Sequence, residues 1–220
     1  MITNYVDNTN FTINGIPVNA SAASFEPSSI TLANDLKVEA EGPIVNGVLK
    51  ADEIKLRGGD AKIAAEVSAI DLNNNTFEVE PVLGQPTIII SLGTETEMKN
   101  EITETESLNI SHLTVGNFVQ MEGYETGVDS MFASQVKVIP TDDIVVQGII
   151  QSGATVGTVK VLGVEFTIED PGETSFEDEN ENSITQATFN SSVTLDSSWI
   201  EVTDNDPSPH IMMRTTSIPI

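Results

Sequence analysis

The sequence predicts an all-β chain made of three tandem copies of one small barrel. Alanine, valine, isoleucine and threonine dominate the 220 residues, and long runs with a helical period are hard to find. Apolar and polar residues alternate over short segments, as in strands that are buried on one face. The same succession of segments also returns further along the chain, which is the mark of an internal repeat.

The repeat is clearest in one hairpin. The stretches "VEAEGPIVNGVLKADEIKLR" (38–57) and "VQMEGYETGVDSMFASQVKVIP" (119–140) share a valine, a glutamate–glycine pair, a polar turn and an alternating run. An offset of 81 positions places Gly42 on Gly123. We therefore interpret this hairpin as a structural signature of the repeated module.

Alternation within the first of these hairpins assigns its side chains to two faces. Val38, Ala40, Ile54 and Leu56 are predicted to face the core, and the charged residues between them are predicted to face water. The charged residues are thus expected to be solvated and not to form a binding site.

Matching the other segments divides the chain into a truncated first repeat at 1–58, a complete barrel at 60–140 and a divergent barrel at 142–220. The first copy begins at the equivalent of a second strand, since "DNTNFTI" corresponds to "NNNTFEV" of the second copy. We expect it to lack its first strand. The edge left open would pair with a neighbouring copy, with another molecule, or with residues that are absent from this sequence.

The complete second copy is predicted to contain five short strands. They are expected near 64–71, 76–82, 87–92, 117–124 and 131–139. Phe77 and Val79 illustrate the two-residue period, and "DLNNNT" and "GYETG" supply residues that favour tight turns.

A longer polar insert, "GTETEMKNEITETESLNISHL", separates the third and fourth strands. Met98 and Ile102 lie four positions apart in it, which predicts a short helical turn. A helix between the third and fourth of five strands is the layout of an OB-type barrel, so each copy is predicted to be OB-like. A run of sandwich-like meanders is the alternative.

One stretch of the second copy resembles a known family. "LTVGNFVQMEG…FASQVKV", with the preceding "AIDLNNNTFEV", is similar to the tandem modules of an uncharacterised bacterial family, known only as a domain of unknown function. The third copy departs from the pattern, because Thr203 and Asp204 replace the glutamate–glycine pair. The resemblance implies β-barrel modules in exported proteins and lipoproteins. It implies no activity and no catalytic residues.

The negative charge of the chain limits the classes of partner that it can bind. Nine Lys and Arg stand against 34 Asp and Glu, a formal net charge of −25. Such a surface repels phosphate backbones and anionic lipids, which argues against nucleic acids and peripheral membrane binding. A protein or cationic partner suits it better. No apolar run approaches the roughly 20 residues of a membrane-spanning helix, so no membrane insertion is expected.

Catalytic patterns are missing from the sequence. The absence of cysteine excludes disulfides, thiolate catalysis and cysteine-ligated metals. The two histidines, His112 and His210, fall outside the HxH and HExxH spacings of metal sites, and there is no GxSxG elbow. We expect no enzymatic activity and no resident cofactor.

The best candidate site is an acidic run, "SFEDENENS", in the third copy. Asp178, Asn180 and Asn182 lie two apart, as oxygen ligands do in the first half of an EF-hand loop. Ser183 stands where the turn needs glycine, and Phe189 stands where the bidentate glutamate should be. A weak calcium site of another kind, joined by the carboxylates of Asp170 and Glu173, is one interpretation, and "DNDPSP" (204–209) is a weaker version of it. A solvated acidic loop is the other interpretation.

These observations predict a non-enzymatic, secreted or cell-envelope β-repeat protein that acts as a structural or interaction module. The alternative is a calcium-dependent or other cation-dependent binding module that uses the acidic loops of the third copy. The polar opening "MITNYVDNTNF" is unlike a signal peptide. A periplasmic or extracellular location would therefore mean that the signal segment is absent from this sequence.

Overall fold

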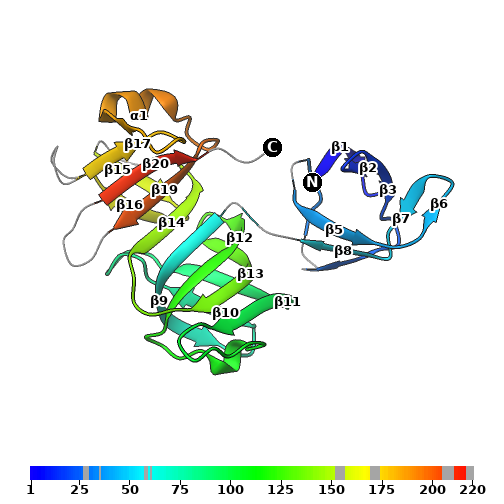
Figure 1. Cartoon of the computed structure of the whole chain (residues 1–220), viewed down its shortest axis with the longest axis horizontal. Coiled ribbons are helices and arrows are strands. Elements are labelled where there is room, and N and C mark those ends of the chain that lie inside the picture. The colour runs from blue at the N-terminus through cyan, green and yellow to red at the C-terminus, as the bar shows by residue number, and fades with distance from the viewer. Residues whose placement is uncertain are drawn as a thin grey trace. The chain divides into compact units, whose positions relative to one another are not determined.

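The computed structural model describes residues 1–26, 30–34, 36–56, 59, 61–151, 157–168, 174–204 and 211–216. The chain forms two compact units, one built on Met1–Gly59 and the other on Asp60–Leu92 and Thr96–Pro219 (Figure 1). Strands dominate both units, and the described residues add one α-helix and one 3-10 helix. The prediction of an all-β chain is confirmed. No described helix is long and apolar enough to cross a membrane.

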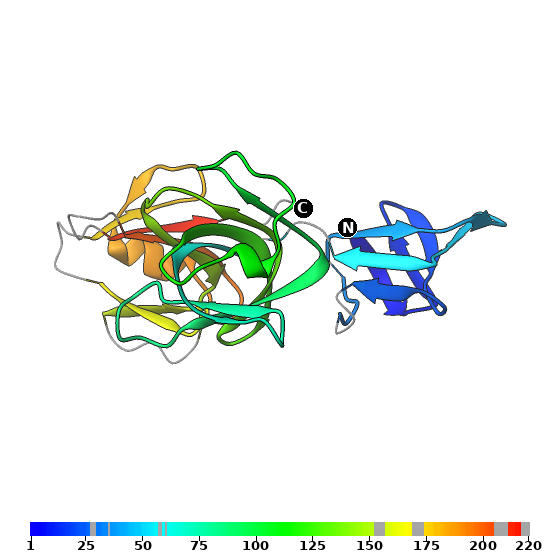
Figure 2. The ribbon, with the colours of Figure 1, turned by 90° about the horizontal axis from the view of Figure 1, so that it is seen from below.

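Eight described strands surround one core in the first unit (Figure 2). They are β1 (Ile2–Asp7), β2 (Asn10–Ile13), β3 (Ile16–Asn19), β4 (Ser24–Glu26), β5 (Val38–Glu41), β6 (Ile44–Val45), β7 (Val48–Lys50) and β8 (Glu53–Leu56). One sheet has the order β1–β2–β3–β7–β6, and the other has the order β4–β8–β5. Phe11, Val18 and Ile54 are buried between them.

The first unit contains a strand that the sequence prediction left out. β1 pairs with β2 in antiparallel fashion, with Ile2 opposite Ile13. The prediction that the first copy lacks its first strand is therefore wrong. Asn4 has a positive φ of 53°, and the pairing register shifts between Thr3 and Asp7. Because of this interruption, β1 lacks the regular alternation by which a strand is recognised in a sequence.

The predicted hairpin of the first copy is present as β5 and β8. Val38 lies opposite Leu56, and Ala40 lies opposite Ile54. Ile54 is fully buried, whereas Val38 and Ala40 are only partly buried against the core. The side chain of Leu56 lies outside the described part of the chain.

Five strands of the second unit close into a barrel. They are β9 (Ala61–Asp71), β10 (Thr76–Val79), β11 (Ile88–Asn100), β12 (Phe118–Gly127) and β13 (Ser130–Val138). Pairing follows the order β9–β10–β11–β13–β12, and β12 returns to β9 to close the ring. β11 and β13 are parallel, and the other pairs are antiparallel. The predicted barrel of the second copy thus has its five strands in a closed order.

The insert between β11 and β12 is not helical where the sequence predicted it. Met98 belongs to β11, lies beside Val136 of β13 and is buried, while Ile102 is exposed in the following turn. The helical turn comes later, as η1 (Ile110–His112), which Asn109 caps. Two apolar residues four positions apart also fit a strand that ends in a turn, and this ambiguity misled the prediction.

The sheet continues beyond β9 into the third copy. Its elements are β14 (Ile144–Ile149), β15 (Thr158–Val161), β16 (Val164–Thr167), β17 (Thr174–Glu177), β18 (Ser183–Ile184), α1 (Gln186–Ser192), β19 (Trp199–Asp204) and β20 (Ile211–Thr216). The order from β9 onward is β14–β19–β20–β17–β18, and β15–β16 form a separate hairpin. A bridge between Ile150 and Val161 connects that hairpin to the end of β14. Phe189 of α1 is buried against Phe176.

The second and third copies share both a sheet and a core. Val145, Val146 and Gln147 of β14 pair with β9, where Val146 lies opposite Ile63. Ile63, Val146 and Ile200 belong to one continuous cluster of buried residues. The structure thus groups 60–140 with 142–220 in one unit, while the division into three copies stays a prediction about the repeat.

Candidate functional site

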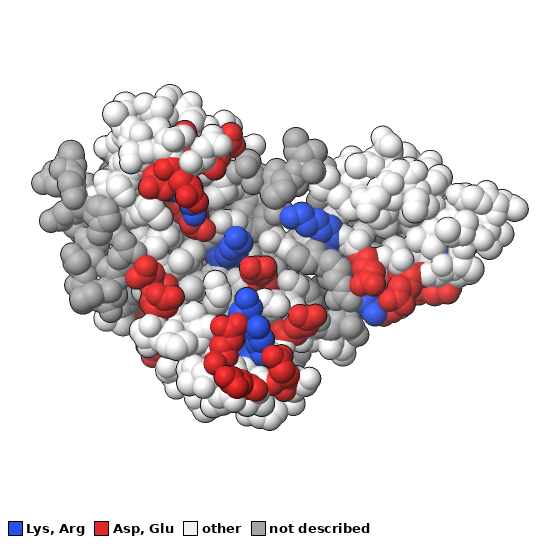
Figure 3. Space-filling view, viewed as in Figure 1, with Lys and Arg blue, Asp and Glu red and all other residues white. Residues whose placement is uncertain are grey.

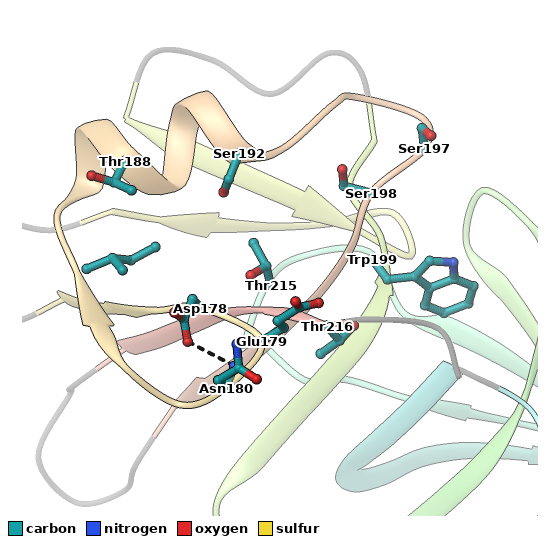
Figure 4. Close-up of a pocket in the computed structure, with 11 residues that line it drawn as sticks. Asp178, Glu179, Asn180, Thr188, Ser192, Ser197, Ser198, Trp199, Thr215 and Thr216 are labelled. Atoms are coloured by element: carbon teal, nitrogen blue, oxygen red, sulfur yellow. Dashed lines mark hydrogen bonds between the residues drawn. The ribbon is translucent and has the colours of Figure 1, made fainter. Parts of the chain in front are cut away.

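An open pocket of about 580 Å³ lies between α1, the β17–β18 turn and the adjoining ends of β19 and β20 (Figure 4). Six of its lining residues carry hydroxyl groups: Thr188, Ser192, Ser197, Ser198, Thr215 and Thr216. Asp178, Glu179 and Asn180 contribute from the turn. Trp199 stands at one side, with its indole directed away from that turn. Two of the three predicted metal ligands, Asp178 and Asn180, line this pocket.

The carboxylate of Asp178 organises the β17–β18 turn. Its Oδ1 accepts hydrogen bonds from the backbone N–H groups of Asn180 and Asn182, each at 2.9 Å. The side-chain amide of Asn182 donates to Oδ1 at 3.1 Å and to Oδ2 at 3.0 Å. The bond from the Asn182 side chain, followed by the backbone bonds, holds the pKa of Asp178 below its ordinary value.

The three predicted metal ligands do come together, as hydrogen-bond partners of one another. Asp178 is the acceptor, and Asn180 and Asn182 are the donors. In the described part of the chain, no three His, Cys, Asp or Glu side chains are grouped so that they could hold a metal ion. Asp170, Glu173 and the segment 205–209 lie outside the described residues. The calcium site stays a prediction.

Arg214 of β20 connects the same turn to the sheet. Its guanidinium contacts the carboxylate of Glu181 at 2.8 Å and that of Glu201, its cross-strand neighbour on β19. Figure 3 shows basic groups on this face beside acidic ones. Glu181 is exposed and Glu201 is mostly buried, so the pair with Glu201 is the one shielded from water and salt. Arg214 therefore links Glu181 of the β17–β18 turn to β20 through an exposed ion pair, and Glu201 of β19 to β20 through a shielded one.

A second polar feature joins the closed barrel to β14. Oε1 of Glu125, near the end of β12, accepts a hydrogen bond from the Ile149 N–H at 2.6 Å. Burial raises the pKa of Glu125, and the bond from Ile149 acts in the opposite direction. The Gln151 amide donates to the Val128 carbonyl at 2.7 Å and accepts from the Gly163 N–H at 3.0 Å. These contacts hold the β12–β13 hairpin against the third copy.

His112 has a structural role at the start of η1. Its Nδ1 accepts a hydrogen bond from the Asn109 N–H at 3.2 Å, which completes a capping box. The imidazole is exposed. His210 lies outside the described residues.

Sequence reasoning missed Glu125 and Arg214. The partner of Glu125 is 24 residues away, and no local pattern distinguishes this glutamate from the others. Arg214 had one usable signal, because no Lys or Arg precedes it back to Val161. A single basic side chain at the end of such an acidic stretch predicts an ion pair with one of its carboxylates.

Comparison with known proteins gives a match to a protein family. The model of a family described as Domain of unknown function (DUF5666) matches residues 1–55 and 65–137, more than half of the chain. The two segments fall within the predicted first and second copies. No curated protein and no solved structure matches the chain.

Proposed function

The chain belongs to this family of unknown function, and from that premise we propose that it is a tandem array of three OB-like barrels that acts as a structural or interaction module. The proposal further places it outside the cytoplasm, in a secreted or cell-envelope setting, without enzymatic activity. The formal charge of −25 supports a soluble, well-dispersed module whose partners are cationic.

Strand order supports the three barrels. In the closed barrel the third strand runs parallel to the fifth, as β11 beside β13. The same parallel pairing recurs in the first unit, where β3 and β4 run beside β7 and β8, and in the third copy, where β17 runs beside β20. In the second and third copies a helical element, η1 or α1, lies between the third and fourth strands. An OB-type fold has this arrangement.

One observation supports the structural role: β9 pairs within the closed barrel and also with the third copy. It is the first strand of the closed barrel, and it also pairs with β14, the first strand of the third copy. A strand pairing backed by a shared core is much stiffer than a flexible linker. We therefore expect 61–216 to behave as one rigid body, which suits a spacer that presents its surfaces at fixed positions.

NMR relaxation of the backbone amides tests this role directly. If the two barrels form one body, backbone amides in β13 and in β20 will report the same rotational correlation time. Two different correlation times would contradict the proposal. Catalytic turnover by the purified chain would contradict its non-enzymatic part.

The Glu125 contact offers a matched pair of variants. Glu125→Ala removes the acceptor of the Ile149 N–H and should lower the unfolding free energy by about 1–2 kcal/mol. Glu125→Gln keeps an acceptor oxygen at the same place, so most of the loss should be restored. Equal losses in the two variants would show that the hydrogen bond does not contribute to the junction.

A second candidate function is calcium-dependent binding at the β17–β18 turn. In its favour, Asp178, Glu179 and Asn180 line one open pocket. Against it, the protein's own N–H groups already bond to the Asp178 carboxylate. Thermal melting with and without millimolar calcium separates the cases, because an ion bound only by the folded state raises the midpoint. An unchanged midpoint would dispose of this candidate.

A further inference from the structure

A second open pocket lies where the closed barrel meets the start of β14. It has a volume of about 470 Å³ and shares no lining residue with the pocket beside α1. β9, the β10–β11 turn, the start of β12 and the segment before β14 all contribute to it. Its apolar lining residues are Val67, Pro81, Leu83, Val115, Phe118 and Ile144. Most of the other lining residues are acidic.

Backbone hydrogen bonds fix the walls of this pocket. The Val67 N–H donates to the Asn117 carbonyl at 2.8 Å, and the Gly116 N–H donates to the Val67 carbonyl at 2.9 Å. The Glu80 N–H donates to the Glu66 carbonyl at 3.3 Å. Segments that line the pocket are thus bonded to one another before any occupant arrives. A preformed site has little ordering left to do, which favours binding.

Two apolar side chains at this pocket are exposed to water. Leu83, in the turn between β10 and β11, is 91% exposed, and Val115, shortly before β12, is 62% exposed. Val67 and Phe118, which line the same pocket, are 0% and 8% exposed. One exposed apolar residue is ordinary on a protein surface, but two at one pocket with an apolar wall indicate an interaction site.

Three carboxylates, here named the acidic rim, line the pocket as well. Glu66 belongs to β9, Glu80 directly follows β10, and Asp142 lies shortly before β14. Oε1 of Glu80 accepts a hydrogen bond from the Gly84 N–H at 2.8 Å, and this bond spans the turn that carries Leu83. In the described part of the chain, no Lys or Arg lines the pocket or forms an ion pair with the acidic rim. The pocket therefore keeps a negative charge that attracts cations.

We propose that this pocket binds a basic polypeptide segment in which one apolar side chain lies between lysine or arginine residues. The apolar side chain would pack against Val67, Phe118 and Leu83, and the basic side chains would lie beside the acidic rim. Exposed ion pairs contribute little free energy each, whereas burial of a leucine-sized side chain contributes more. Apolar contact therefore supplies most of the affinity, and charge supplies fast association and selectivity.

The distribution of charge favours this occupant over two others. The acidic rim comes from three separate segments, so several positive charges suit it better than the single charge of a small amine. A second copy of the chain would bring its own acidic rim to the contact, and two chains of formal charge −25 repel each other. The inference rests on the interaction role proposed above and names the chemistry of the partner. Failure of peptide binding would leave the shared correlation time of β13 and β20 unaffected, so the two proposals can fail separately.

Binding of two matched peptides by the full chain tests the proposal. The probe is fluorescein-labelled GKKLKKG, and the control GKKSKKG has the same charge but serine in place of the leucine. In fluorescence anisotropy at physiological ionic strength, we expect saturable binding of the probe and about tenfold weaker binding of the control, because only the probe buries a leucine. Absence of saturable binding would overturn the proposal. So would equal binding of the two peptides, since net charge alone would then explain the attraction.

A matched pair of exposed apolar residues locates the site. Leu83→Ser removes apolar surface from the pocket and should weaken binding of the probe about tenfold. Ile102→Ser is the control, because Ile102 is 58% exposed in a different turn and does not line the pocket. The Ile102→Ser variant should bind the probe as the natural chain does. Unchanged binding by Leu83→Ser, or equal losses in both variants, would overturn the proposal.

Val115→Ser covers the case in which Leu83→Ser does not fold. Val115 is the second exposed apolar residue of the pocket, and its loss should weaken probe binding about fivefold. The urea transition of Trp199, the single tryptophan, shows whether each variant is folded. Unchanged binding by a folded Val115→Ser variant would overturn the proposal.

The acidic rim is tested by removing one charge at a time. Glu66→Gln and Glu104→Gln each remove one negative charge, but Glu104 lies in the turn after β11 and does not line the pocket. We expect about threefold weaker binding for Glu66→Gln, the effect of one exposed ion pair, and unchanged binding for Glu104→Gln. Equal binding by these two variants would overturn the proposal. A dimer of the natural chain, seen by sedimentation, that Leu83→Ser dissociates would also overturn it, because the occupant would then be a second copy.

Discussion

The hairpins of the first two copies carry a glycine at a position where the third hairpin carries an aspartate. A Cβ atom on Gly123 would lie 1.9 Å from the Phe132 carbonyl oxygen, and one on Gly42 would lie 2.0 Å from that of Lys50. In the third copy Asp204 takes this place, and β19 pairs with β20 without a register shift. Glycine is thus required where one strand approaches the backbone of its partner too closely for any side chain.

The difference explains what the glutamate–glycine signature is for. Pairing of β12 with β13 shifts register between Glu122 and Gly123, as at a β-bulge, and a bulge bends a strand. β12 is ten residues long and has to curve around a closed barrel, whereas β19 has six residues and stays regular. The signature therefore marks curvature, and its loss in the third copy marks a straighter hairpin.

The largest effect is expected from Gly123→Ala. The new Cβ would meet backbone atoms, which cannot rotate away, so the strand itself has to move. We expect a loss of about 3 kcal/mol or more in the unfolding free energy of the second unit. Urea titration followed by the fluorescence of Trp199, the single tryptophan, measures it. Asp204→Gly is the matched control and should cost about 1 kcal/mol or less. Equal losses of stability in Gly123→Ala and Asp204→Gly would show that glycine is not specifically required at position 123.

Gly42→Ala makes the same test in the other unit. Its φ of 155° and the Lys50 carbonyl both oppose a side chain. The first unit should lose stability, seen as faster hydrogen exchange at Phe11 and Val18. The Trp199 transition should not move, because Trp199 belongs to the other unit. A shift of that transition would mean that the two units unfold together.

A smaller effect is expected from Gly148→Ala, where the contact is mainly with a side chain. The new Cβ would lie 2.3 Å from Oε1 of Glu125 and 2.9 Å from a methyl group of Val161. Glu125 can swing away, so we expect a loss of about 1–2 kcal/mol. In the Glu125→Ala background the cost should fall, and a double-mutant cycle measures the coupling. If Gly148→Ala costs as much stability in the Glu125→Ala variant as in the natural chain, its clash is not with Glu125.

The smallest effects concern pH, and they have opposite signs at two carboxylates. Burial raises the pKa of Glu125 above its ordinary 4.5. Folding therefore favours the protonated form of Glu125. The natural chain should lose stability relative to Glu125→Gln as the pH rises from below 4.5 through the raised pKa of Glu125. The pKa of Asp178 is lowered from 3.8. The natural chain should therefore be more stable than Asp178→Asn above pH 3.8. That advantage should be lost as the pH falls through the lowered pKa of Asp178. Melting temperatures across this acid range measure both, and parallel pH profiles would contradict the assignment.

The sequence predicted elements well where the two-residue period was unbroken. Phe77 and Val79 alternate in a regular strand, and β10 is present there. At β1 the positive φ of Asn4 broke the pattern, and a real strand was missed. The period is a local property, so it fails wherever one residue leaves the extended conformation.

The candidate site was predictable only in part, for a related reason. Asp178, Asn180 and Asn182 are close in sequence, so their meeting in one turn could be foreseen. The role of the Asp178 carboxylate in that turn could not be foreseen. Backbone N–H groups of the same turn donate hydrogen bonds to it and so compete with a metal ion. The contact between Glu125 and Ile149 depends on the approach of the closed barrel and the third copy, which no local pattern records.

The double pairing of β9 has a consequence for synthesis of the chain. β9 leaves the ribosome well before β14, so the edge that β14 later covers is exposed while the closed barrel folds. Exposed edges of this kind invite pairing with neighbouring nascent chains. Lys62 lies on that edge opposite Gln147, and an edge lysine discourages such pairing. The same side chain thus protects the nascent chain until its own downstream strand arrives.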